Sequence, residues 1–383
     1  MKVQLLVALL STSAWMSPTL GQTVVLNEDG SAATTGLVQP GQDVIIPADC
    51  ADEANQVDVV VCAADQFLGL LSEEQKSQVV LPLEVANSTA WSNLPCGTNC
   101  RVGVVLADLS EEQQTAALAV VKAATSEFGD DGYDELTQIT MADDILGLAQ
   151  ESGIGGGPGG GGGTPNGEPP DGMSMPPDMS PMPAPPDGGG GGLGTGAGGY
   201  DSANYLIAFL GQPSTTDTWQ LQFGGHHLAL LKTYANDAEV GSTPAFSGVE
   251  PKVWQTETET FAPLEDDREA MRAMLAGLTD EQRAAAKLDQ AFSDVILGPG
   301  EDGQFPAEKV GLRVGDLDAE QKQLVLAALG EWVRDTASTS ADQIMAAYEA
   351  GIDDTYIAFS GSADLANHAD YVRIDGPRAW VEF

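Results

Sequence analysis

Alternating apolar and polar residues distinguish the stretch Tyr205–Tyr234 from the rest of the chain. Within it, Trp219, Leu221 and Phe223 are separated by single glutamines. Successive side chains of a strand point to opposite sides of a sheet, so this spacing predicts a strand with one buried face. We therefore expect the other elements of the protein to be arranged around this stretch.

Two glycines and two histidines follow this predicted strand. Gly224 and Gly225 interrupt the alternation, because glycine adopts a positive φ or a bulge without steric cost. The apolar pattern then resumes, which predicts a second strand that starts at His226. In such a strand, the imidazoles of His226 and His227 point to opposite faces. We expect His227 to face a pocket and His226 to face the solvent.

Four predicted helices begin with the same local pattern. Each has a leucine, then a capping residue, and a glutamine three positions after the cap, which together form a capping box. The capping residues are Ser72, Ser110, Thr279 and Asp318. The two pairs of caps have nearly equal spacing, and Arg101–Ser110 aligns with Lys309–Asp318 without a gap.

A second alignment extends this similarity to the predicted hairpins, because Tyr205–Gly211 resembles Thr355–Gly361. The predicted fold class is α+β, with an internally duplicated module of a helix pair plus an antiparallel β-hairpin around one shared core. Chance similarity between amphipathic helices is the alternative explanation.

Composition divides the chain further. A short basic start followed by an apolar run is typical of a signal peptide. A tract of Gly, Pro, Met, Ser and Asp buries too little apolar surface to fold, which predicts a disordered insert. The predicted organisation is a signal peptide (1–21), an N-terminal β-rich or loop lead-in with cysteines (22–65), a first helical module (66–152), the disordered insert (153–199), a first β-hairpin module (200–264), and a second helical and β-hairpin module (265–383).

The charge balance is strongly acidic. The chain has 57 Asp and Glu against 16 Lys and Arg, which gives a formal net charge of −41. Such a surface repels nucleic acid and anionic lipid, so we expect neither as a partner. Outside the predicted leader, no apolar run in the sequence is long enough to span a membrane. We therefore expect a secreted or periplasmic protein.

The four cysteines are expected to form disulfides. An even number of cysteines in an exported chain favours disulfides, and we expect the pairs Cys50–Cys62 and Cys96–Cys100. A zinc site made of all four thiolates is the alternative, but the sequence lacks the paired C-x2-C spacing that is usual in such sites.

Several short segments form a further set of motifs. They are Gly211–Ser214 leading to Trp219, Gly225–Leu228, Thr243–Pro251 and Tyr371–Pro377, together with the leucine-to-glutamine helix starts. In these segments the chain resembles the uncharacterised DUF3500 family, over roughly residues 65–383 apart from the predicted insert. The resemblance implies no established activity. Family members continue past the last segment with further histidines and an Arg-Asp pair, so the resemblance also implies a C-terminally truncated member.

Histidine is scarce in this chain, and its three copies all fall in the predicted hairpin modules. Imidazole is a common ligand of Zn²⁺ and Cu²⁺, so His226, His227 and His368 are candidate metal ligands. A structural role for the imidazoles is the alternative. A pocket with an aromatic wall and a few polar groups is typical of a small-ligand site. The candidate binding residues are Trp219, Gly225, His226, His227, Phe246 and Glu250.

Our leading interpretation is an exported binding protein of unknown ligand, with a pocket lined by His and Trp that could hold a transition metal such as zinc or copper. A secreted hydrolase is the second interpretation. In it His227 acts with Glu250 or Asp217, and Ser214 offers a hydroxyl. However, the sequence has no G-x-S-x-G or H-E-x-x-H motif. Whether the protein is an enzyme stays open.

Overall fold

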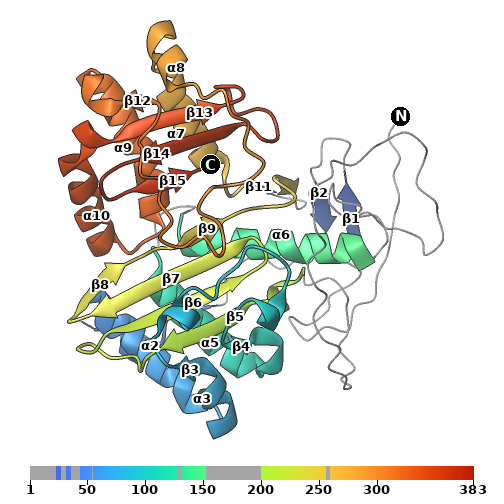
Figure 1. Ribbon diagram of the computed structural model, residues 1–383. Coiled ribbons are helices and arrows are strands. Elements are labelled where there is room, and N and C mark those ends of the chain that lie inside the picture. The colour runs from blue at the N-terminus through green and yellow to red at the C-terminus, as the bar shows by residue number, and fades with distance from the viewer. Residues whose placement is uncertain are drawn as a thin grey trace, which may run out of the picture.

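Helix starts follow the local capping chemistry in the computed structural model, which describes residues 23–26, 32–35, 44–53, 55–126, 131–151, 200–255 and 259–383 (Figure 1). The four predicted capping residues, Ser72, Ser110, Thr279 and Asp318, each accept a hydrogen bond from the glutamine N–H three residues later. Each glutamine side chain accepts one in return from the backbone of the cap. The predicted helix starts are confirmed. The predicted signal peptide and insert lie outside the described residues.

The first unit contains a seven-stranded sheet and the helices that cover it. Its helices are α1 (Ala48–Ala51), α2 (Gln56–Leu70), α3 (Glu73–Val79), α4 (Val85–Ser88), α5 (Glu111–Ala124) and α6 (Tyr133–Glu151). Its strands are β3 (Val80–Leu81), β4 (Val104–Val105), β5 (Leu206–Leu210), β6 (Trp219–Gly225), β7 (Leu228–Ala235), β8 (Ala238–Gly241) and β9 (Ala245–Ser247). Apolar side chains of α2 and α5 pack against the Trp219, Leu221 and Phe223 face of the sheet. Gln220 and Gln222 on the other face are buried as well, so the expectation of a single buried face is wrong.

The second unit also combines helices with a sheet, which has four strands. Its helices are α7 (Glu265–Ala276), α8 (Asp280–Ala286), α9 (Ala319–Arg334) and α10 (Ser338–Ala350), and its strands are β12 (Leu312–Arg313), β13 (Tyr356–Ser360), β14 (Tyr371–Asp375) and β15 (Trp380–Glu382). A third, small sheet joins β1 (Thr23–Leu26) and β2 (Ala32–Thr35) to β10 (Trp254–Gln255) and β11 (Thr260–Phe261). The fold is therefore α+β.

Several contacts occur at matching places in both units. The short strand β4 pairs with β5 just as β12 pairs with β13. At the start of each, a glycine with positive φ lies so close to the neighbouring strand that an added Cβ would be 2.3 Å from a carbonyl oxygen: Gly103 from that of Ile207, and Gly311 from that of Ile357. Only glycine fits at these two positions.

The two units meet at α6, which runs between them in Figure 1. Thr125, after α5, forms an antiparallel bridge with Thr336, after α9. The backbone N–H of Gly132 donates to Asp335 Oδ1 at 2.9 Å, and Lys232 Nζ donates to Thr336 Oγ1 at 2.6 Å. We call these contacts the joint. They link the end of α5, the start of α6 and β7 to the residues that follow α9.

Three carboxyls lie at this joint, one from each of three helices: Glu135 from α6 and Asp267 from α7 are buried, and Asp335 at the end of α9 is partly buried. Burial raises the pKa of Asp267 to about 8 and that of Asp335 to about 6, and neighbouring acids add to the rise for Asp267. Burial also raises the pKa of Glu135 well above its usual value. The joint therefore holds protons that an unfolded chain would release near neutral pH.

Both expected cysteine pairs are formed. Cys50 joins Cys62 between α1 and α2, and Cys96 joins Cys100 in the loop after α4. The region expected to be a lead-in already contains α1 and the start of α2, whose first turn is capped by the Asn55 side chain. Within the described part of the chain, every helix is too short or too polar to cross a lipid bilayer.

Candidate metal centre

The two adjacent histidines form the turn between β6 and β7. Gly225 pairs with Leu228, so His226 and His227 are the two residues of a hairpin turn, and His227 has a φ of 62°. The expectation that a strand starts at His226 is therefore wrong. Alternation of faces holds only for extended backbone, and the left-handed residue turns its side chain back. The two imidazole rings lie side by side, with 3.6 Å between their centroids.

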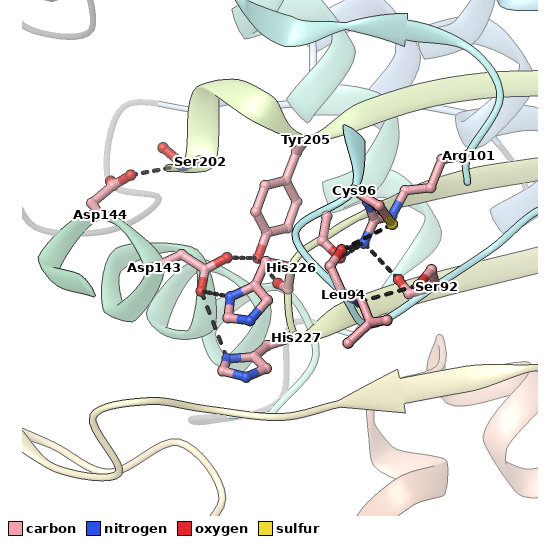
Figure 2. A network of polar contacts seen from close by, with 11 residues as sticks. Ser92, Leu94, Cys96, Arg101, Asp143, Asp144, Ser202, Tyr205, His226 and His227 are labelled. Atoms are coloured by element: carbon pink, nitrogen blue, oxygen red, sulfur yellow. Dashed lines mark hydrogen bonds and ion pairs between the residues drawn. The ribbon is translucent and has the colours of Figure 1, made fainter. Parts of the chain in front are cut away.

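An aspartate from α6 meets both rings (Figure 2). Asp143 Oδ1 lies 2.8 Å from His226 Nδ1 and 3.7 Å from His227 Nδ1. One donor atom from each of these three residues lies within 4.8 Å of the others, and they are the metal-capable group found among the described residues. Two imidazoles and one carboxylate form a donor set that binds divalent transition metals.

Burial is graded across this group. The Asp143 side chain is 1% exposed, that of His226 is 7%, and that of His227 is 21%. The site therefore opens to solvent on the His227 side. The expectation that His226 faces the solvent is wrong, because its side chain is buried. Tyr200 covers His226 edge-on, at 4.6 Å between ring centroids.

Tyr205 contacts the carboxyl group of Asp143. Its Oη lies 2.9 Å from Asp143 Oδ2 and 2.6 Å from the carbonyl oxygen of His226. A phenol has one hydrogen, so both contacts are hydrogen bonds at once only when Asp143 carries the second proton. The ring of Tyr205 also explains Gly225, because an added Cβ there would lie 2.3 Å from the ring.

Arg101 holds the turn from the other side. Its guanidinium is buried, and Nη2 shares its two N–H groups among the carbonyl oxygens of Ser92, Leu94 and Gly225. These contacts tie the loop that precedes Arg101 to the last residue of β6 (Figure 2). The same loop accepts a hydrogen bond from the backbone N–H of His227, at the Asn93 carbonyl, over 3.2 Å. The Cys96–Cys100 disulfide closes this loop.

The electrostatics of the site favour uncharged groups when no cation is present. Burial raises the pKa of Asp143 to about 8, while the hydrogen bond from Tyr205 and the charge of Arg101 oppose the rise. Burial lowers the pKa of His226 to about 4 and that of His227 to about 3. Both imidazoles are therefore neutral at neutral pH, which is the form that binds a metal.

One donor atom in this group is unused. His227 Nδ1 is buried and has no hydrogen-bond partner among the described residues. A buried polar nitrogen without a partner costs free energy unless something else satisfies it. It lies beside Asp143, where a cation would meet it.

Trp219, Ser214 and Asp217 lie away from the histidines. Trp219 begins β6 and the histidines follow its end, so the six strand residues 220–225 separate them. Trp219 is fully buried and stacks on Tyr234. Ser214 Oγ is 3.5 Å from Asp217 Oδ2 in the connection between β5 and β6, at the end of the sheet opposite to the histidines. The structure does not bring Trp219, Ser214 or Asp217 to His227.

Other candidates are closer to the turn. Phe246 lies on β9 beside β7 and contacts Trp91, at 6.4 Å between ring centroids. Glu250 lies on the loop after β9, and its charge acts on both Asp143 and His226. His368 lies in the connection between β13 and β14 of the second unit and is not part of the metal-capable group.

Sequence reasoning missed Asp143, Tyr205 and Arg101 as site residues. Asp143 and its neighbour Asp144 stand in an otherwise apolar part of α6, and a pair of acids at such a place in a helix is a usable signal. Arg101 aligns with Lys309, and that alignment was visible in the sequence. Nothing local marks Tyr205 as a partner of Asp143.

A sequence comparison identifies one family. The family model described as "Protein of unknown function (DUF3500)" matches residues 53–383. No curated protein and no solved structure matches the chain.

Proposed function

The chain belongs to the DUF3500 family, whose description assigns no function, and we propose from the site itself that the protein binds a divalent transition metal ion. Asp143, His226 and His227 are the ligands, and zinc or copper is the ion. The observation that carries this proposal is the convergence of three donor groups from two separate elements, two of them buried and one partly buried, with His227 Nδ1 left without a partner among the described residues.

The spacing of the donor atoms suits such an ion. In a tetrahedral zinc centre, bonds of about 2.0–2.1 Å place neighbouring ligand atoms roughly 3.3 Å apart. The contacts from Asp143 to the two imidazole nitrogens, 2.8 and 3.7 Å, lie on either side of that value. The site therefore needs only small side-chain movements to accept an ion.

Metal titration of the full chain tests the proposal. After treatment with a chelator, calorimetric titration with Zn²⁺ or Cu²⁺ should show a single site per chain. His227→Ala and Asp143→Asn should abolish that binding. His368→Ala is the matched control, because it removes a histidine outside the group, and it should bind as the wild type does. Equal loss in all three variants, or no binding by the wild type, would refute the proposal.

Hydrolysis has weaker support. Of the carboxylates considered for it, Asp217 lies at the other end of the hairpin, while Glu250 lies near the histidines. The role of Glu250 therefore decides whether the metal centre is a binding site or a reactive one.

We also propose that the protein works outside the cytoplasm. The Cys50–Cys62 and Cys96–Cys100 disulfides support this location, because such bonds persist in oxidising compartments. The strongly negative net charge supports a metal or a small ligand, rather than nucleic acid, as the partner.

We further propose that the two units arose by internal duplication. The matched capping boxes, the Gly103 and Gly311 contacts, and the matched strand pairs support this origin. If so, the metal centre belongs to the first copy, because the turn residues at the matching place in the second copy are Pro377 and Arg378.

A further inference from the structure

The loop that follows β9 is fixed to the histidine turn. The backbone N–H of Gly248 donates to the carbonyl oxygen of His227 at 2.7 Å. Gly248 also lies against the imidazole, because an added Cβ would be 3.5 Å from His227 Cδ2. The backbone two residues before Glu250 is therefore in contact with the exposed side of the candidate metal centre.

Glu250 is the acid that this loop offers to the site. It follows Gly248 by two residues on the loop whose backbone contacts the His227 imidazole, which places it at the edge of the site, and its charge acts on Asp143 and His226. Glu250 is exposed, and no hydrogen bond or ion pair engages its side chain within the part of the chain that the structure describes. It is thus a carboxylate free to change its rotamer, beside the open side of the group.

We propose that Glu250 is the fourth ligand of the metal ion and closes the site on its His227 side. This inference rests on the metal centre proposed above. Two imidazoles and two carboxylates complete the four-coordinate shell that zinc takes in closed sites. The two carboxylate charges also neutralise a divalent ion, which lowers the cost of holding it in a buried place.

The consequence is a choice between two kinds of metal centre. A catalytic zinc keeps one position for water, whereas a structural or carrier site has four protein ligands. With Glu250 bound, the centre holds its ion and has no position for a reacting water. The protein is then a metal-binding protein and not a metal-dependent hydrolase.

Affinity measurements test the role of Glu250. Zn²⁺ is titrated into the full chain of the wild type, of Glu250→Gln and of Asp217→Asn. The last is the matched control, because it removes one exposed acid at the far end of the same hairpin. Loss of an outer-shell partner alone weakens metal sites about 10–100-fold, so Glu250→Gln should weaken Zn²⁺ binding by at least about 100-fold. Asp217→Asn should change the affinity less than about twofold.

Coordination number gives a second readout that a change in general charge would not produce. Co²⁺ in a four-coordinate tetrahedral site absorbs visible light much more strongly than Co²⁺ in a five- or six-coordinate site. The wild type loaded with Co²⁺ should show the strong bands, and Glu250→Gln should show weaker ones, because water replaces the carboxylate. Asp217→Asn should keep the wild-type spectrum.

The outcomes separate this inference from the function on which it rests. If the wild type binds Zn²⁺ and Glu250→Gln binds it equally well with an unchanged Co²⁺ spectrum, the fourth ligand is refuted and the three-residue centre stands. If the wild type does not bind, the metal centre itself is refuted. Equal weakening by Glu250→Gln and Asp217→Asn would show a long-range charge effect and would also overturn the assignment.

Discussion

The two hairpin turns of the molecule share a scaffold and differ in chemistry. In the first unit, the turn between β6 and β7 carries His226 and His227, and Asp143 approaches it from α6. In the second unit, the turn between β14 and β15 carries Pro377 and Arg378. There, Pro377 packs against Gly351 at the end of α10. The second turn has no histidine in its sequence, and Pro377, rather than a carboxyl group, meets the end of its helix.

The supports behind the turns correspond more closely than the turns themselves. Arg101 donates to the carbonyl oxygen of Gly225, and the aligned Lys309 donates to the carbonyl oxygen of Asp375 at 3.1 Å. Lys309 also forms an ion pair with the Asp375 carboxylate at 2.5 Å. A basic side chain therefore holds the end of the central strand in each unit. The chemistry of the site depends on the turn residues and on α6, whereas the supporting contacts behind the two turns are similar.

Removal of the basic supports should give the largest contrast between the units. Arg101 is 7% exposed and satisfies three carbonyl oxygens, so Arg101→Met leaves those groups without their donor. We expect a loss of about 3–5 kcal/mol in the free energy of unfolding, together with loss of metal binding.

Lys309→Met is the matched variant in the second unit. The Lys309 side chain is 34% exposed, so we expect a smaller loss of about 1–2 kcal/mol and unchanged metal affinity. Urea unfolding and metal titration measure both quantities. Equal losses in the two variants would mean that the supports are equivalent and that Arg101 has no special link to the site.

A methyl group added before each turn should give the next largest contrast. In Gly225→Ala the new Cβ meets the Tyr205 ring at 2.3 Å, whereas in Gly376→Ala it meets Thr355 Oγ1 at 2.9 Å. The buried ring cannot move away, so we expect Gly225→Ala to lower the free energy of unfolding by about 3 kcal/mol. The hydroxyl can rotate, and Gly376→Ala should cost about 1 kcal/mol. Chemical denaturation of both variants tests this order.

The joint between the units should respond to pH. The pKa of Asp267 is raised to about 8 in the folded protein, so the folded state binds more protons than the unfolded state between about pH 4 and pH 8. The contribution of Asp267 to the free energy of unfolding is therefore greatest below about pH 4, and it is lost as the pH rises from about 4 through 8. The charges that face it are those of Glu135, Asp335, Glu331 and Asp131, with Lys232 as the nearby cation.

Asp267→Asn imitates the protonated carboxyl. We expect this variant to be more stable than the wild type by about 2 kcal/mol at pH 8, and to differ little from it at pH 4. The comparison is made by urea unfolding at both pH values, with Asp217→Asn as the control for general charge. A stability gain that is the same at pH 4 and pH 8 would show that proton binding by Asp267 is not the cause.

The predictable parts of this protein are those that depend on neighbouring residues. The helix starts at Ser72 and Ser110 follow from cap and glutamine three residues apart. The Cys96–Cys100 pair is likewise local. The apolar face of β6, which packs on the helices, follows from alternation, although the glutamine face is buried too. In each case a short segment contains the physical cause of the structure, so one sequence is enough to find it.

The candidate site depends on contacts that no short segment contains. Asp143 lies 83 residues before His226, with the predicted insert between them, and the pattern of α6 says nothing about what it faces. The hairpin turn was misplaced because glycine or asparagine usually supplies a positive φ, and here His227 supplies it. The two glycines before it serve another purpose, since Gly225 makes room for the Tyr205 ring.

The helix caps should give the smallest effects, and they test how far the two units are equivalent. Ser110 starts α5 in the first unit, and Asp318 starts α9 in the second. Their side chains accept from the N–H of Gln113 at 3.3 Å and from that of Gln321 at 2.9 Å. The side chain of each glutamine also forms a hydrogen bond to a glutamine of a neighbouring helix: Gln113 to Gln75 of α3, and Gln321 to Gln282 of α8. Loss of either cap therefore loosens both a helix end and a contact between helices.

We expect Ser110→Ala and Asp318→Ala each to lower the free energy of unfolding by about 1 kcal/mol, which is the usual effect of a lost cap. The loss at Asp318 should be slightly larger, because an anion at a helix N-terminus also interacts with the helix dipole. Ser110→Asp is the matched control in α5. It keeps an acceptor and adds the charge, so it should be at least as stable as the wild type. Suppose that Ser110→Ala leaves the free energy of unfolding unchanged while Asp318→Ala lowers it by about 1 kcal/mol. The two helix pairs would then differ in their dependence on the cap, and the units would not be equivalent in their helices.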